Sequence, residues 1–426
     1  MSLRDLARRL TAVALAAVDP ERLVYDRLRE HPERFDAILA VGKAAAAMAR
    51  GTRPAVSPSF SPRRLLVRPQ SSPALLDPGW EQRSGGHPLP DRQSVAAGER
   101  VRDFLAALAP GQKVLALVSG GASACLELPA PGLTLEDLTA TQRLLLASGL
   151  PIHTVNTVRK HLSALKGGGA LRVTAGEVLA LVLSDVPGDD LSTVASGLFA
   201  ADPTSFAEAL AAVERLPVPE AVRRHLLAGV RGEVPETVKP GDPVLGRVRT
   251  VGIGGVRTAV EAVVAELRRL GFAAVEGELA GEAADAGREL VRRGRALGTV
   301  LGTSGVALVL GGETTVTLAA GPGGQGGRNQ EMALAAAGAL AEGSASQEVV
   351  LTLATDGEDG PTRAAGGVVD GGTWEAIRRA GGDPAGALER HDSGRALKLA
   401  SGALLETGVT GTNVGDLAIY LRHPSA

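Results

Sequence analysis

The sequence is poor in several residue types that particular classes of protein require. Cys125 is the only cysteine, so neither an intrachain disulfide nor a cysteine-rich metal site can form. Aromatic residues make up 2% of the chain, too few for recognition of nucleic acid by base stacking. No apolar run approaches the roughly 18 residues of a membrane span, and the net charge of -2 favours neither nucleic acid nor an acidic membrane as a partner. These absences favour a cytoplasmic enzyme.

The composition is that of a globular protein with two domains. At 426 residues, with 44% apolar and 22% charged residues, the chain is too long for one ordinary core. Apolar runs typical of strands alternate with helical patterns, which predicts an α/β fold whose first domain has a largely parallel sheet. Prolines interrupt the pattern between about residues 216 and 243, so we expect domains over 1–240 and 245–426.

The second half is expected to be a smaller α/β domain with a mixed sheet. Gly311 and Gly312 separate two apolar runs, and this spacing predicts a hairpin over residues 306–318. We leave open whether the last residues of the chain pack back on the first domain.

The glycine-rich loop Gly321–Arg328 has two interpretations. It matches the dinucleotide pattern G-x-G-x-x-G literally, but Pro322 interrupts the turn and no acidic residue ends a strand about 20 positions later. The loop fits better as an anion cradle, in which Gly326 and Gly327 bring backbone N–H groups close to a phosphate and Arg328 begins a helix. The alternative is a plain loop with a surface arginine.

A second turn of small residues, Ser119–Ser123, follows an apolar strand. Open α/β sheets bind ligands at the carboxyl ends of their parallel strands. Ser119, Gly120, Gly121 and Ser123 are therefore candidate contacts of a substrate or nucleotide. Helix capping explains the same residue types equally well.

Basic residues suggest where an anionic ligand would bind. Lys43 follows an apolar strand at a place where the dipole of the next helix opposes a cation, and we interpret this as compensation by a ligand anion. A solvated lysine is the alternative. Asn156, Arg159 and Lys160 share one face of a predicted helix, which suits a carboxylate or a phosphate, or else forms a solvated basic face.

Two acidic turns follow apolar strands, one in each half of the chain. Asp185 and Asp189 lie in the first turn and Asp356 in the second. Mg²⁺ is commonly held by one or two carboxylates together with phosphate oxygens, so these three residues are candidate ligands, although such turns also form without a metal. His87 lies in a proline-rich loop, where local packing explains it at least as well as a ligand role does.

Together these segments resemble the glycerate 2-kinase family, whose C-terminal part is known as the MOFRL domain. The matching segments run in order through nearly the whole chain and are Ala40–Ala44, Gly86–Asp91, Ser119–Ser123, Asn156–Lys160, Ser184–Asp189, Gly311–Thr315, Gly326–Glu331, Ala354–Gly360 and Thr410–Asp416. Any one of these motifs is weak evidence. Nine in the same order form a specific pattern.

The resemblance implies a kinase that uses ATP to phosphorylate the 2-hydroxyl of D-glycerate, giving 2-phosphoglycerate. It also implies a larger Rossmann-like first domain, a smaller second domain, and a site in the cleft between them. Lys43 and Arg328 match positions regarded as functional in the family, and we assign them to the transferring phosphate or the glycerate carboxylate. Asp189 would position the hydroxyl or hold Mg²⁺, with Asp185 and Asp356 as further candidate ligands.

Two other functions stay open at this point. An NAD(P)-dependent hydroxypyruvate reductase, a label this family has carried, is supported only by the literal glycine pattern. A non-enzymatic regulator would bind a sugar acid without turnover, but it would gain nothing from the acidic turns. The expected partners are ATP and D-glycerate, and a homo-oligomer is left open.

Overall fold

The computed structural model describes residues 2–55, 61–186, 191–301, 305–318, 324–343 and 347–423. The chain divides into two compact units, Pro20–Ile253 and Met1–Asp19 with Gly254–Ala426. We call the first the central unit and the second the terminal unit, because the second contains both ends of the chain. Each unit has its own sheet and its own apolar core.

The division differs from the expected domains 1–240 and 245–426 in two respects. The central unit continues past the proline-rich segment because strand β6 (Val248–Gly254) joins the edge of its sheet beside β5. The first helix, α1 (Leu3–Ala17), belongs to the terminal unit, where it packs against α11 (Val256–Arg269). The last strand, β12 (Asp416–Arg422), belongs to the sheet of the terminal unit.

The central unit is built on a six-stranded sheet with the order β3-β2-β1-β4-β5-β6. Its other strands are β1 (Ala37–Val41), β2 (Arg63–Pro69), β3 (Glu81–Gly85), β4 (Lys113–Ser119) and β5 (Glu177–Leu183). The pairings from β3 across to β5 are all parallel. This confirms the largely parallel sheet, and the strand order is that of doubly wound nucleotide-binding folds.

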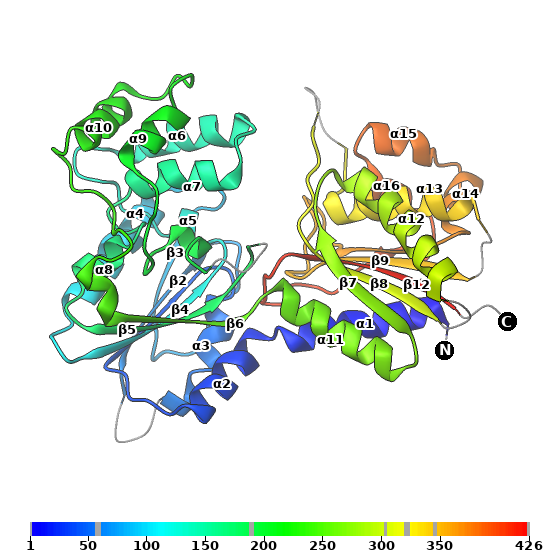
Figure 1. Ribbon diagram of the computed structural model, residues 1–426, viewed down its shortest axis with the longest axis horizontal. Helices are drawn as coiled ribbons and strands as arrows, with labels where there is room; N and C mark the ends of the chain where they lie inside the picture. The colour runs from blue at the N-terminus through cyan, green and yellow to red at the C-terminus, as the bar shows by residue number, and fades with distance from the viewer. Residues whose placement is uncertain are drawn as a thin grey trace. The chain divides into compact units, whose positions relative to one another are not determined.

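Helices surround this sheet and form a second cluster beyond it. They are α2 (Pro20–Glu30), α3 (Ala45–Arg50), α4 (Arg92–Ala106), α5 (Ala122–Cys125), α6 (Leu135–Ala147), α7 (Ile152–His161), α8 (Gly169–Val173), α9 (Phe206–Ala212) and α10 (Glu220–Val230). Strand β1 is buried at every position, as expected for a continuous apolar run between two helical layers. The helices α6, α7, α9 and α10 share a separate apolar cluster and lie together in Figure 1.

The terminal unit has a mixed six-stranded sheet with the order β11-β10-β9-β12-β8-β7. Its strands are β7 (Ala273–Leu279), β8 (Val306–Gly312), β9 (Glu348–Ala354), β10 (Gly366–Asp370), β11 (Leu404–Leu405) and β12 (Asp416–Arg422). β7 pairs with β8 in parallel, and β12 pairs antiparallel with both β8 and β9. The mixed sheet is confirmed.

The expected hairpin over residues 306–318 is wrong. β8 ends at Gly312, whose φ of +154° favours glycine and where a Cβ would lie 2.1 Å from the carbonyl oxygen of Leu279. The following segment forms only an isolated bridge between Thr315 and Glu282. The antiparallel partner of β8 is β12, from more than 100 residues further along the chain.

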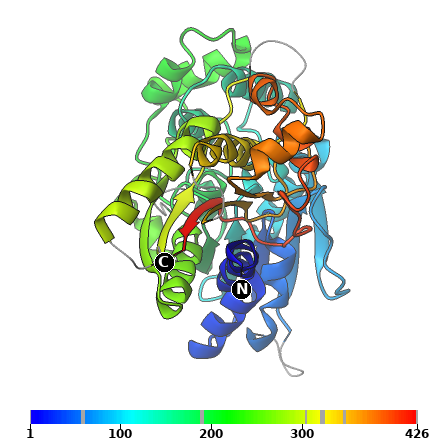
Figure 2. The ribbon, with the colours of Figure 1, turned by 90° about the vertical axis from the view of Figure 1, so that its right-hand side faces the viewer.

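Helices cover both faces of the terminal sheet. In addition to α1 and α11 they are α12 (Ala283–Leu301), α13 (Arg328–Ala341), α14 (Thr373–Arg379), α15 (Pro384–Glu389) and α16 (Ser393–Lys398). α1 and α11 lie on one face, and α12 to α16 lie on the other (Figures 1 and 2). Within the described residues, no helix is both long and apolar enough to cross a membrane.

Candidate active site

The carboxyl ends of β1 and β4 bring two of the predicted segments together in the central unit. The two strands are parallel neighbours, so the loops that follow them meet at one edge of the sheet. The backbone N–H of Lys43 donates to the carbonyl oxygen of Gly120 at 2.8 Å, and the N–H of Ala44 donates to Ser119 Oγ at 3.1 Å. The buried Ser119 hydroxyl also donates to the carbonyl of Val41 at 3.2 Å. Ser119 thus fixes the two loops to each other.

Three side chains converge on the Gly120–Gly121 turn. A Cβ on Gly120 would lie 1.6 Å from a carboxylate oxygen of Asp185, so that carboxylate occupies the space beside the turn. A Cβ on Gly121 would lie 2.9 Å from Cγ of Lys43 and 3.6 Å from Nε2 of His87. The side chains of a lysine, an aspartate and a histidine therefore lie around two residues that have no side chain of their own. For His87 the sequence favours local packing at least as much as a ligand role, and the structure places its ring beside Gly121.

A chain of hydrogen bonds runs from the same turn to helix α7. Ser123 Oγ lies 2.8 Å from Ser196 Oγ, which donates to Asn156 Oδ1 at 3.3 Å. A guanidinium nitrogen of Arg159 donates to the same amide oxygen, also at 3.3 Å. Ser196 and its neighbour Ala195 have φ values of 53° and 55°, a conformation that costs about 1–3 kcal/mol per residue and is concentrated at functional sites. These hydrogen bonds connect the predicted residues Ser123 and Asn156 through Ser196, which belongs to none of the motifs found in the sequence.

Lys160, predicted to contact a substrate, has an internal partner. Its Nζ lies 3.3 Å from Asp202 Oδ1, and both side chains are buried. Asp202 also accepts hydrogen bonds from the hydroxyls of Thr204 at 2.7 Å and Thr237 at 2.9 Å. Burial acts to raise the pKa of Asp202, but the hydrogen bond from Thr204 and the charge of Lys160 outweigh it and lower the pKa. Lys160 therefore balances a buried carboxylate, and its contact with a substrate stays a prediction.

In the terminal unit, Arg328 is held by two carboxylates at the start of α13. Its Nε and Nη2 donate to the two oxygens of Asp416, and Nη1 donates to Glu313. Burial acts to lower the pKa of Arg328, but Asp416 and Glu313 raise it above its usual range. Burial also raises the pKa of Asp416 to about 6, against the opposing effect of Arg328. The guanidinium is thus fixed in orientation, with its side chain 34% exposed.

The amino end of α13 is already capped by a carboxylate of the protein. The backbone N–H groups of Asn329 and Gln330 donate to the two oxygens of Asp359 at 3.0 and 2.8 Å. Burial raises the pKa of Asp359, and these hydrogen bonds oppose the increase. The predicted phosphate cradle relied on N–H groups at this helix start, and two of them are satisfied internally.

The glycines of this loop are required by packing against the protein itself. A Cβ on Gly327 would lie 2.5 Å from Asp359 Oδ1, and one on Gly326 would lie 2.3 Å from Ser393 Oγ. Residues 321–323, the first part of the predicted loop, lie outside the described residues. The small size of Gly326 and Gly327 therefore has a structural explanation, while their contact with a ligand stays a prediction.

The two described candidate Mg²⁺ ligands belong to different units of the chain. Asp185 lies at the Gly120–Gly121 turn of the central unit, and Asp356 lies in the terminal unit, where it accepts a hydrogen bond from the N–H of Glu358 at 3.2 Å. Asp189 lies outside the described residues. Among those described, no group of three or more His, Cys, Asp or Glu is placed to hold a metal. The position of Asp185 fits a Mg²⁺ ion that takes one or two protein carboxylates and completes its shell with phosphate oxygens and water.

Two family models match the chain. One is described as a domain of unknown function (DUF4147) and matches residues 6–228. The other describes the MOFRL family and matches residues 306–416. The first model contains the Gly120–Gly121 turn, and the second contains Arg328, Asp359 and Asp416.

Individual proteins are similar to the chain over almost its whole length. A glycerate 2-kinase from Pyrococcus horikoshii is 38% identical over 99% of this chain and 98% of its own. A D-glycerate 2-kinase from Thermotoga maritima is 39% identical, also over 99% of this chain and 98% of its own. A protein from Agrobacterium vitis with the provisional name of a hydroxypyruvate reductase is 39% identical, over 99% of this chain and 95% of its own.

Structural similarity agrees with the sequences. The crystal structure of a glycerate kinase from Thermotoga maritima has a TM-score of 0.86 to this chain at 37% identity, and the match covers 99% of both chains. The resemblance seen in the nine short segments is confirmed by family models over both halves of the chain and by relatives over its full length. This chain belongs to the glycerate 2-kinase family with a C-terminal MOFRL domain.

Proposed function

We propose that the protein transfers the γ-phosphoryl group of ATP to the 2-hydroxyl of D-glycerate. The observation that carries the proposal is the convergence of Lys43, Asp185 and His87 on the Gly120–Gly121 turn, at the carboxyl edge of a parallel sheet. Ligands of such sheets bind at this edge. The glycerate 2-kinase names of full-length relatives indicate which small molecule is the acceptor.

Phosphoryl transfer requires positioning and charge neutralisation more than covalent chemistry. We assign to Lys43 the neutralisation of negative charge on the transferring phosphate, since its side chain lies against Gly121. Gly120 and Gly121 are assigned to contact the phosphate or the acceptor, and Gly121 is the less buried of the two. His87, close to Gly121, and Ser123, two residues further along the chain, are assigned to orient the substrates.

Mg²⁺ is the cofactor of this proposal, with ATP as co-substrate. Asp185 and Asp189 are the proposed protein ligands in the central unit, and Asp356 is a further candidate. When bound, the ion supplies neutralisation of charge on the ATP phosphates. Asp189 is also the residue assigned to position the acceptor hydroxyl.

In the terminal unit we assign Arg328 to the same reaction, as a donor to phosphate. Its pairing with Asp416 and Glu313 holds the guanidinium in one orientation, and preorganised donors stabilise transition-state charge more effectively than mobile ones. Gly326 and Gly327 support this arrangement by allowing close packing at the start of α13.

The reductase alternative is less well supported by the residues. It rests on the literal G-x-G-x-x-G pattern and on the provisional name of the Agrobacterium vitis relative. In dinucleotide-binding folds the pyrophosphate takes the free N–H groups of the helix start. Here the corresponding N–H groups of Asn329 and Gln330 are already bonded to Asp359.

A direct comparison of the two reactions tests the proposal. The purified protein is incubated either with ATP, Mg²⁺ and D-glycerate, while ADP formation is followed, or with NADH or NADPH and hydroxypyruvate in the absence of ATP. Glycerate-dependent ADP formation without nucleotide oxidation is the expected result. Oxidation of the reduced nucleotide would favour the reductase, and binding of glycerate without either reaction would favour a regulator.

A further inference from the structure

Arg159 is a partly buried cation whose hydrogen bonds go to neutral groups. Its Nε donates to Gln142 Oε1 at 2.8 Å, and Nη1 donates to Asn156 Oδ1 at 3.3 Å. No carboxylate of the described residues lies within ion-pair distance of its guanidinium. Burial lowers the pKa of Arg159, and the more distant charge of Glu127 only partly opposes this. Burying a charge without a counter-charge is unfavourable, so a bound anion would stabilise the Arg159 guanidinium at this position.

The other buried charges around helix α7 are already matched in pairs. Lys166 contacts Glu127, and the two side chains are 2% and 6% exposed. Lys160 pairs with Asp202. Each of these carboxylates has its own lysine, which leaves Arg159 as the surplus positive charge among these five residues.

The contrast with Arg328 shows which arginine has capacity for a ligand carboxylate. Arg328 contacts two carboxylates of the protein, Asp416 and Glu313. Arg159 contacts two amide oxygens and retains a second terminal nitrogen that makes no hydrogen bond among the described residues. A planar guanidinium with free donors is the preferred partner of a carboxylate.

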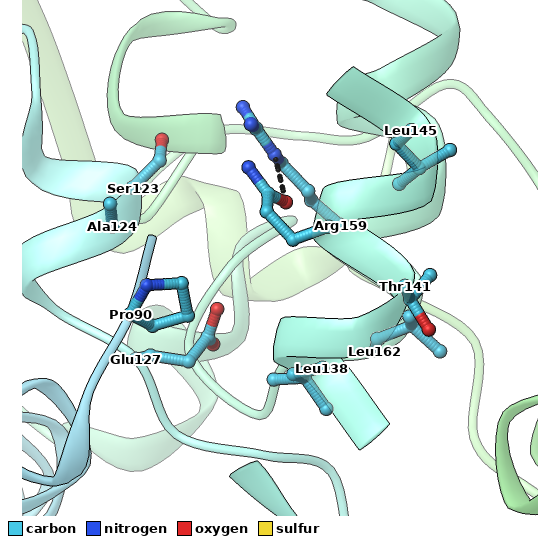
Figure 3. Close-up of a pocket in the computed structure, with 10 residues that line it drawn as sticks. Pro90, Ser123, Ala124, Glu127, Leu138, Thr141, Leu145, Arg159 and Leu162 are labelled. Atoms are coloured by element: carbon cyan, nitrogen blue, oxygen red, sulfur yellow. Dashed lines mark hydrogen bonds between the residues drawn. The ribbon is translucent and has the colours of Figure 1, made fainter. Parts of the chain in front are cut away.

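Arg159 and Ser123 line the same small cavity of the central unit (Figure 3). The cavity measures about 20 Å³, room for a group of about the size of one water and not for a whole sugar acid. Its other polar lining includes Gln142 and Glu127. Because Ser123 belongs to the turn that also carries Gly120 and Gly121, the cavity adjoins the site assigned to phosphoryl transfer.

We propose that Arg159 binds the carboxylate of the hydroxy-acid substrate and thereby selects an acid over a neutral alcohol. Asn156 and Gln142 position the guanidinium by accepting from it, and Ser196 holds Asn156 in turn. Lys43 is then left to the phosphate. The inference rests on the proposed function, because the carboxylate in question is that of D-glycerate.

Comparison of D-glycerate with its neutral amide, glyceramide, in wild type and Arg159→Gln tests the assignment. In the variant, kcat/KM for D-glycerate is expected to fall by about 10- to 100-fold, the range for a hydrogen bond to a charged group. For glyceramide kcat/KM should change by less than about threefold, and KM for ATP should stay constant. An equal fall in kcat/KM for both acceptors would indicate a general loss of activity and would overturn the proposal. A rise in KM for ATP with unchanged KM for glycerate would assign Arg159 to a phosphate instead.

The matched control is Arg143→Gln, an exposed arginine on the neighbouring helix α6, which is expected to behave as wild type with both acceptors. Should Arg159→Gln fail to fold, Arg159→Lys retains the charge without the planar fork and is expected to weaken selection of glycerate over the amide. Unchanged selection in that variant would overturn the proposal. Wild type that phosphorylates no glycerate would refute the proposed function itself, a result separate from that of either variant.

Discussion

Lys43 lies against Gly121 where two parallel strands end. We predict that Lys43→Ala lowers kcat for glycerate phosphorylation by about 10²- to 10³-fold, because the variant loses a preorganised positive charge at the transferring phosphate. Steady-state ADP formation measures the loss. The control is Lys113→Ala at the amino end of β4, where the lysine is 44% exposed and pairs with Glu33. Equal activities of the two variants would remove Lys43 from the mechanism.

The carboxyl group of Asp416 is expected to make the free energy of unfolding depend on pH in a definite direction. Burial raises its pKa in the folded state to about 6 from an ordinary value of 3.8, so the folded state binds a proton that the unfolded state releases between these values. The contribution of this carboxyl to stability is therefore largest below the unfolded pKa and is lost as pH rises through 6. Relative to Asp416→Asn, we expect wild type to lose about 1–3 kcal/mol of unfolding free energy between pH 4.5 and 7.

Urea unfolding can follow this effect in the terminal unit alone. The chain has two tryptophans, of which Trp80 lies in the central unit and Trp374 in the terminal unit. In a Trp80→Phe background the fluorescence of Trp374 reports the unit that contains Asp416. If wild type instead gains stability over Asp416→Asn as pH rises, Arg328 dominates over burial and the sign is wrong.

Substitution of Lys160 can distinguish a structural role of this residue from contact with a substrate. Removing one member of a buried ion pair leaves an uncompensated charge and costs about 3–5 kcal/mol, so Lys160→Met should strongly destabilise the central unit. Trp80 fluorescence in a Trp374→Phe background measures this. Lys113→Met, which removes a surface lysine, is expected to cost less than about 1 kcal/mol. A stable but inactive Lys160→Met protein would instead support contact with a substrate.

A candidate site residue can be predicted when the sequence pattern that marks it lies next to it in the chain. It cannot be predicted when the residue is positioned by a partner far away in the sequence. Lys43 and Gly120 are predictable as candidates because each directly follows an apolar strand. Ser196 is not, because its hydroxyl is positioned by a left-handed backbone and by Asn156, 40 residues away. Nothing in the residues around Lys160 indicates its pairing with Asp202.

At the scale of elements, α13 depends on the loop that caps it. We predict that Gly327→Ala destabilises the terminal unit by about 1–3 kcal/mol, since the added Cβ would lie 2.5 Å from Asp359 Oδ1 and such overpacking forces the backbone to shift. The Trp374 reporter again measures the change. At Gly372 a Cβ would meet only Asp370 Oδ1, at 3.5 Å, so Gly372→Ala should stay within about 0.5 kcal/mol of wild type. Similar stabilities of the two variants would contradict this account of Gly327.

The pairing of a strand is harder to predict from the sequence than the strand itself, as β8 shows. The apolar run that forms β8 is evident in the sequence, but its neighbour in the sheet is not. Gly311 and Gly312 suggest a hairpin, whereas the sheet pairs β8 with β12 across a long stretch of chain. Register along one strand is set by local side chains, while the choice between distant partners depends on the packing of the whole unit.

At the scale of the whole molecule, the chain forms two units with separate cores. Prolines marked the approximate position of the division, but strand β6 extends the central unit beyond them. Helix α1 joins the unit formed by the far end of the chain because its apolar face packs against α11. That partnership links residues about 250 positions apart in the sequence, and no local pattern indicates it.

The central claim is that this molecule phosphorylates the 2-hydroxyl of D-glycerate. Incubation of wild-type protein with ATP, Mg²⁺ and D-glycerate, followed by proton-coupled phosphorus NMR of the products, tests it most directly. A phosphorus signal split by one proton, as in 2-phosphoglycerate, is the result that we predict. A signal split by the two protons of a CH₂ group, as in 3-phosphoglycerate, or the absence of any phosphorylated glycerate would contradict the claim.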